Sequence, residues 1–261
     1  MKKYFIILPV LFTILILSIV VYYKFDPALL SRLSFYVNLA NPSMRIVRIQ
    51  EGLRKEEIVE VVASKLDWSV AEKEDFINNT NGASVEGHYF PKTYLIYKDE
   101  EPYAVTATMV DEFNKQVSKV KKPKSKQIVN EETALKIASI IQREAAGKRD
   151  MNLISGIIWN RIFNGMKLQI DATLQYAKGN EEDGWWGQVT SEDKKIKSSY
   201  NTYLHQGLPP GAIANPGIAA IAAAYNPQKT SCLFYLHDKN RKIHCAKTYE
   251  EHKRNIDIYL K

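Results

Sequence analysis

The sequence is poor in cysteine, with Cys232 and Cys245 as the only two among 261 residues. Neither cysteine belongs to a Cys/His pattern with zinc-site spacing, and the five histidines form no HExxH pair. The sequence therefore predicts no metal site and no cofactor. A disulfide between the two cysteines is allowed in an oxidising compartment, but cysteines on neighbouring strands are as often merely packed, so both alternatives stay open.

The chain also lacks an arginine-rich patch with interleaved aromatic residues, which argues against nucleic acid as a partner. Its 36 lysines and arginines exceed its 29 aspartates and glutamates, and the formal net charge is +7. Outside the cell, such a charge favours an anionic polymer or a membrane surface as the neighbour. Fifteen tyrosines and four tryptophans suit sugar-stacking surfaces and ordinary cores equally well.

Charged residues are missing from Tyr4 to Tyr23, a run whose length matches the apolar thickness of a bilayer. The run ends in large residues, which favours an uncleaved helix over a signal peptide. We therefore predict a transmembrane anchor over 1–25 and a stalk over 26–44. Lysines before the run favour a single-pass protein of the cell (inner) membrane, with its catalytic part outside the cytoplasm.

The segment 45–125 is predicted to hold a small LysM-like unit and a connecting region. Alternating residues predict a strand over 45–50, a turn at Gly52 and an amphipathic helix over 55–66. Strand, glycine turn and helix in so short a span resemble a LysM-like unit, a small fold of wall-associated proteins. Further helices are expected over 70–78 and 103–117.

The remaining residues, 126–261, are predicted to form a mixed α/β catalytic domain, which makes the fold class α+β. Its first helix places Ile137, Ile140, Ile141 and Glu144 on one stripe. A carboxyl group on an apolar face should have a raised pKa, as a general acid requires. The alternative is a structural ion pair between Glu144 and a neighbouring basic residue, Arg143, Lys148 or Arg149.

After this helix, Leu168 and Ile170 alternate with polar residues and predict a short strand. Gln169, Asp171 and Thr173 would then point the same way and form one wall of a site, unless they mark a plain exposed strand edge. Farther along, the residues predict a rigid proline loop, a helix over 218–225 capped by Asn215, a hairpin and a closing helix.

Several separate stretches, taken together and in order, resemble the endolytic murein transglycosylases of the YceG-like group. They are Glu86-Gly-His-Tyr-Phe-Pro-Lys-Thr-Tyr94, Ala138-Ser-Ile-Ile-Gln-Arg-Glu144, Asn160-Arg161, Met166-Lys-Leu-Gln-Ile-Asp-Ala-Thr173, Tyr200-Asn-Thr-Tyr203, Gly207-Leu-Pro-Pro-Gly211, Ala214-Asn-Pro-Gly217 and Lys247-Thr-Tyr-Glu-Glu-His252.

The resemblance implies a membrane-anchored lyase that cuts peptidoglycan glycan strands internally between N-acetylmuramic acid and N-acetylglucosamine. It would leave 1,6-anhydro ends, terminate strand elongation and have cell-wall synthases as further candidate partners. The family's catalytic glutamate matches Glu144. We expect substrate-binding roles for Gln169, Asp171, Thr173, Tyr200, Asn201 and Thr202.

The sequence departs from the family pattern at Gln142, where many members carry an acidic residue, and at Ala172, where many carry proline. The first departure favours Glu144 over its neighbour as the acid. One alternative function is a peptidoglycan hydrolase that uses Glu144 together with Asp171. The other is a non-catalytic tether that binds the wall through the LysM-like unit.

Overall fold

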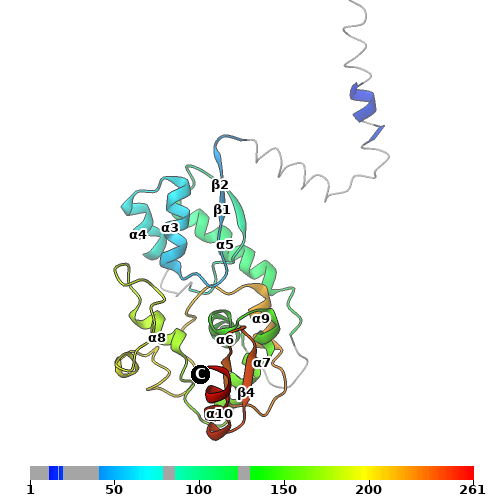
Figure 1. Ribbon diagram of the computed structural model, residues 1–261. Helices are drawn as coiled ribbons and strands as arrows, with labels where there is room; N and C mark the ends of the chain where they lie inside the picture. Colours follow the sequence, from blue (N-terminus) through cyan, green and yellow to red (C-terminus); the bar gives the residue numbers. More distant parts are fainter. Residues whose placement is uncertain (1–11, 17, 20–40, 79–85, 123–129) are drawn as a thin grey trace, which may run out of the picture.

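The computed structural model describes residues 12–16, 18–19, 41–78, 86–122 and 130–261, and the account below is confined to them. In these ranges the protein is a mixed α+β structure, with many helices and two small antiparallel sheets. Figure 1 shows a small unit, residues 44–117, next to a large unit, residues 130–261. There are two hydrophobic clusters, one within the small unit and one centred on the large unit that also includes Phe90, Phe113 and Val117.

The predicted transmembrane helix is not supported. Much of the predicted anchor and stalk lies outside the described residues, and 12–16 and 18–19 form short, exposed helical pieces. A helix needs about 20 residues to span a bilayer, and no helix in the described ranges is both long enough and apolar enough. This finding overturns the predicted anchor and, with it, the predicted single-pass membrane location.

The small unit begins with strand β1 (Met44–Arg48), followed by helices α3 (Lys55–Leu66) and α4 (Val70–Asn78). Strand β2 (Thr93–Tyr97) pairs with β1 in antiparallel fashion and places Tyr94 opposite Val47. The sequence predictions of β1, α3 and α4 are confirmed, whereas β2 was missed. Helix α5 (Pro102–Val117) contributes Val105 and Met109 to this core and extends towards the large unit.

The large unit is centred on helices α6 (Glu131–Glu144), α7 (Lys148–Phe163) and α9 (Ile218–Tyr225). The isoleucine stripe of α6 is buried against α7 and α9, so the predicted apolar face is confirmed. Asn130 caps α6 through its side chain, which accepts a hydrogen bond from the Thr133 backbone N–H at 2.7 Å. Helix α8 (Asp171–Lys178) packs next to α6.

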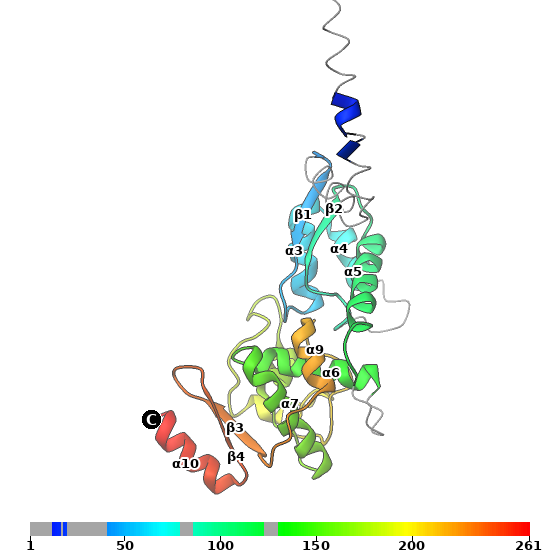
Figure 2. The same cartoon turned by 90° about the vertical axis from the view of Figure 1, so that its right-hand side faces the viewer.

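The chain ends in a hairpin of strands β3 (Phe234–His237) and β4 (Ile243–Ala246), followed by helix α10 (Tyr249–Tyr259). The predicted hairpin and the predicted closing helix are both confirmed, including the capping box between Thr248 and Glu251. A disulfide joins Cys232, just before β3, to Cys245 on β4 and so cross-links the two sides of the hairpin. Figure 2 shows the hairpin and α10 at the end of the large unit remote from the small unit.

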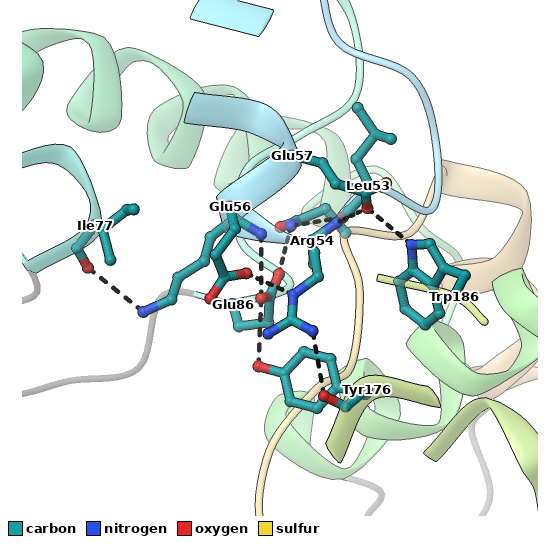
Figure 3. Close-up of polar contacts among 10 residues, drawn as sticks. Leu53, Arg54, Glu56, Glu57, Ile77, Glu86, Tyr176 and Trp186 are labelled. Atoms are coloured by element: carbon teal, nitrogen blue, oxygen red, sulfur yellow. Dashed lines mark hydrogen bonds and ion pairs between the residues drawn. The ribbon is translucent and has the colours of Figure 1, made fainter. Parts of the chain in front are cut away.

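The two units are joined by a cluster of aromatic and charged side chains (Figure 3). The buried Arg54 guanidinium lies between the rings of Tyr176 and Trp185, 4.3 Å from each ring centre. The indole N–H of Trp186 donates to the Glu57 carboxylate at 2.8 Å. Residues at the start of α3 are therefore fixed to the α8 region by cation–π contacts and charge-assisted hydrogen bonds.

Glu86 lies buried at the centre of the same junction. Its carboxyl group accepts hydrogen bonds from the Asn215 side chain at 2.6 Å and from the Lys55 backbone N–H at 3.2 Å. Burial raises the pKa of Glu86 to about 7, because its charged form loses hydration. Asn215 therefore links the units, and the prediction that it caps α9 is wrong, since Gly217 occupies the cap position.

Candidate active site

Glu144 is the last residue of α6 and lies where the buried isoleucine stripe reaches the surface. Its side chain is partly exposed and lines a cavity of about 460 Å³. Its lining comes from α7, the turn before α8, β3 and the first turn of α10. The lining residues are Glu144, Ile157, Ile158, Arg161, Leu168, Gln169, Ile170, Asp171, Lys194, Leu233, Phe234, Tyr203, Tyr235, Tyr249 and His252.

The hydroxyl group of Tyr235 donates a hydrogen bond to Glu144 Oε2 at 2.6 Å. Burial raises the pKa of Glu144, and this effect outweighs the opposing influence of the Tyr235 hydrogen bond. The negative charge of Asp171 raises the pKa further. A carboxyl group in these surroundings holds its proton at a higher pH than an exposed glutamate would.

The alternative of a structural ion pair with Arg143 is not what the structure shows. The Arg143 guanidinium lies 3.6 Å from the centre of the Trp186 ring and donates to the Gly52 carbonyl oxygen at 3.3 Å. Arg143 thus contributes to the junction between the units, while Glu144 on the same helix turn lines the cavity. Lys148 and Arg149 are exposed at the start of α7.

Gln169 and Asp171 both line the cavity, but not on a strand as predicted. Gln169 has a φ of 53°, in the left-handed region that residues other than glycine seldom adopt, and Asp171 begins α8. The Tyr203 hydroxyl group donates to Asp171 Oδ1 at 2.5 Å. A second carboxyl group is therefore held in the cavity by a turn with an uncommon backbone conformation.

Thr173, Asn201 and Thr202 are buried and do not line the cavity. The Thr202 hydroxyl oxygen accepts from the Ile170 backbone N–H at 3.0 Å and lies 2.9 Å from that of Thr173. The Asn201 side chain donates to the carbonyl oxygens of Lys194 and Ile196 at 3.1 and 2.8 Å. These predicted substrate contacts instead support the segments that carry Asp171, Lys194 and Tyr203.

Tyr200 is also separated from the cavity around Glu144. Its ring packs on Tyr176 with ring centres 4.9 Å apart, on the side of the junction. Burial raises the pKa of Tyr200, and the next contribution is the charge of Glu86. The structure thus brings Glu144, Gln169 and Asp171 together and leaves the other four predicted residues outside the cavity lining.

Several residues of the cavity were not predicted as site residues from the sequence. Tyr235 and Phe234 come from β3, Tyr249 and His252 from α10, and Arg161 from α7. The stretch from Lys247 to His252 was a sequence signal, because it belongs to the family resemblance, yet nothing in its pattern indicates proximity to Glu144. Within the described part of the chain, no group of three or more His, Cys, Asp or Glu side chains is arranged to hold a metal ion.

A model of the YceG-like family matches residues 22–258. A protein of Bacillus subtilis strain 168, named endolytic murein transglycosylase, is 34% identical over 187 residues, which cover 71% of this chain and 51% of that protein. A protein of the same name from Streptococcus pneumoniae serotype 2, strain D39, is 32% identical over 66% of this chain and 32% of its own length.

The chain therefore spans about half of the first of these relatives (51%) and about a third of the second (32%). Its fold is also similar to the crystal structure of a YceG-like protein from Listeria monocytogenes. The TM-score is 0.71 at 27% sequence identity, and the similarity covers 82% of this chain and 76% of that one.

Proposed function

The chain belongs to the YceG-like family, and from this membership and the cavity at Glu144 we propose that it is an endolytic peptidoglycan lytic transglycosylase. The name carried by the Bacillus and Streptococcus relatives supports this reaction class. The observation with the most weight is the carboxyl group of Glu144, which lines the cavity and has a raised pKa. Such a group can hold a proton until a glycosidic oxygen is placed beside it.

In the proposed reaction, Glu144 donates its proton to the glycosidic oxygen between N-acetylmuramic acid and N-acetylglucosamine. The bond from that oxygen to C1 of the muramic acid breaks, and the glucosamine sugar leaves with the proton. The Glu144 carboxylate then takes the proton from the 6-hydroxyl group of the muramic acid, whose oxygen bonds to C1. The products are a new chain end and a 1,6-anhydro end, no water is consumed, and Glu144 is protonated again.

Asp171 is suited to stabilise the positive charge that develops at C1, because its carboxylate is held in the same cavity as Glu144. Gln169 contributes a polar side chain to the same wall and is proposed to position the substrate. Thr173, Asn201 and Thr202 are proposed to act indirectly, by fixing the segments that carry the cavity residues. Tyr200 packs on Tyr176 on the side of the junction, so we propose no direct substrate contact for it.

The small unit is proposed to be LysM-like, which would provide a second contact with the glycan. Its support is the succession of strand β1, a turn at Gly52, which has a φ of 85°, and helix α3. We keep 45–125 and 126–261 as the proposed division between this unit with its connecting region and the catalytic domain. A synthase that supplies nascent strands is the class of protein partner that this role implies.

Product analysis tests the proposal directly. The full chain is incubated with purified glycan strands in isotope-labelled water, and the products are examined by mass spectrometry. We expect internal cleavage, with anhydro ends that contain no solvent oxygen and are lighter by one water molecule than hydrolysis products. Reducing ends that carry the labelled oxygen would instead support a hydrolase that uses Glu144 and Asp171.

The same assay with Glu144→Gln separates catalysis from tethering. The substitution keeps the shape of the side chain and removes the transferable proton, so no anhydro products are expected. If cells that carry this variant keep the wild-type distribution of glycan lengths, the tether is the better description of the protein.

A further inference from the structure

We propose that the rings of Phe234, Tyr249 and His252 form an aromatic platform on which one sugar ring of the glycan strand stacks, next to the bond that is cut. This inference rests on the proposed function and adds a binding subsite to it. All three residues line the cavity that contains Glu144. They come from β3 and α10, whereas Gln169 and Asp171, which line the same cavity, lie just before and at the start of α8.

The platform is a stacked cluster in which Tyr249 is the most exposed ring and Phe234 and His252 are half-buried. The Phe234 and His252 rings are nearly parallel, with centres 5.5 Å apart and an interplanar angle of 23°. The Tyr249 ring lies 5.9 Å from that of Phe234. Tyr249 is 56% exposed although it lines the cavity, so its ring is available to a ligand. The C–H face of a pyranose packs well on such a ring, because an aromatic side chain offers a large rigid apolar surface.

Two cationic groups border the platform. The Arg161 guanidinium lies 5.0 Å from the centre of the Phe234 ring, and the Lys253 ammonium group lies 5.1 Å from the centre of the Tyr249 ring. Lys194 also lines the cavity. An apolar ring bordered by cations suits a sugar chain that carries carboxyl groups, whereas it would suit a neutral polysaccharide less well.

The position of α10 supports a role in binding rather than in folding. All of α10 lies in the described part of the chain, and none of its residues is buried. Its neighbours in the fold are β3 and β4, and Figure 2 shows it on the outside of the hairpin. A helix that buries so little apolar surface adds little to the core. Its capping box nevertheless fixes its first turn, which carries Tyr249, at the cavity.

The test measures binding and cleavage separately. Binding of glycan strands without stem peptides is measured by calorimetry on the full chain carrying Glu144→Gln, with and without Tyr249→Ala. We expect Tyr249→Ala to weaken binding about tenfold, the scale of one lost aromatic contact. In the wild-type background it should raise KM much more than it lowers kcat. Tyr249→Phe, which keeps the ring, should restore both values.

Phe163→Ala provides a matched control, because Phe163 is 61% exposed and belongs to the same large unit as the platform but does not line the cavity. It should leave binding and KM unchanged. Tyr249→Leu keeps an apolar side chain against Phe234, so it controls for the possibility that the alanine variant binds weakly because it is misfolded. It should also bind weakly, since it lacks a flat ring.

The two proposals fail in different ways. If the wild-type protein releases anhydro-ended fragments while Tyr249→Ala and Tyr249→Leu bind and cut as it does, the platform is wrong and the reaction stands. If the wild-type protein neither binds nor cuts the strands, the proposed function falls, and the platform falls with it.

Discussion

Glu144 and Glu86 are both carboxyl groups with raised pKa values, yet they lie in regions of opposite character. Glu86 is sealed in the junction and receives hydrogen bonds from Asn215 and from the Lys55 backbone. Glu144 lines an open cavity and has a hydrogen bond from Tyr235. A perturbed pKa therefore does not identify the catalytic acid by itself. What distinguishes Glu144 is that a substrate can reach it.

The largest expected difference between the two regions is in activity. Glu144→Gln should lower the rate of anhydro-end formation by about a thousandfold or more, because it removes the group that we propose as acid and base. Glu86→Gln should keep most of the activity, since no substrate reaches the junction. Initial rates of fragment release, measured by mass spectrometry at equal protein concentrations, give the comparison. Equal losses in both variants would contradict the distinction between the two carboxyl groups.

The second expected difference concerns stability and pH. The pKa of Glu86 is about 7 in the folded protein, against an ordinary value of 4.5. The unfolded chain therefore loses this proton at a lower pH than the folded protein, so the contribution of Glu86 to stability falls as the pH rises from 4.5 to about 7. The whole change is about 3 kcal/mol, at roughly 1.4 kcal/mol per pH unit.

Glu86→Gln should remove that decline, although it also loses one accepted hydrogen bond at every pH. Urea unfolding of the wild type and the variant at about pH 5 and about pH 8 measures the effect through the free energy of unfolding. The same unfolding measurements on Glu144→Gln provide the comparison with a carboxyl group in the other region. If the difference between the wild type and Glu86→Gln were the same at both pH values, Glu86 would not titrate in this window.

The smallest expected effect comes from Tyr235→Phe. Tyr235 is a positioning residue, and its hydroxyl group stabilises the charged form of Glu144. Without it the pKa of Glu144 should rise further, so the alkaline limb of the profile of kcat/KM against pH should move to higher pH. The maximal rate should fall by about tenfold or less, the scale of one hydrogen bond to a charged group.

Tyr203→Phe is the matched control, because Tyr203 donates to Asp171 rather than to Glu144. It should move the alkaline limb less than Tyr235→Phe does. An unchanged limb in Tyr235→Phe would mean that the tyrosine hydroxyl does not influence the proton of Glu144, or that Glu144 does not set this limb.

Periodicity and capping motifs were sufficient where the pattern lies within a single helix. The stripe that ends at Glu144 and the capping box at Thr248 are both found as predicted, because these patterns are set by neighbours within one helix. The alternation of Leu168 and Ile170 led to a wrong prediction of a strand, since both side chains are buried but the backbone between them is not in a strand. The left-handed backbone of Gln169 depends on support from Thr202, which is distant in sequence.

The other residues of the cavity were harder to predict from the sequence than the position of Glu144. Tyr235 reaches Glu144 across 91 positions in the sequence, and this contact depends on how the hairpin packs on the large unit. Asn215 has the local pattern of a helix cap, but its side chain instead satisfies Glu86 and the backbone of Leu53. Such long-range contacts leave no periodic trace in the sequence, so spacing alone cannot find them.

The arginine held between Tyr176 and Trp185 has a consequence for how a polymer would be handled. Because Arg54 and its neighbours cross-link the two units, a strand touching both would meet them at a set offset. Movement of one unit relative to the other would then play no part in determining which bond is broken. The spacing between the two contacts would then be a fixed property of the folded protein.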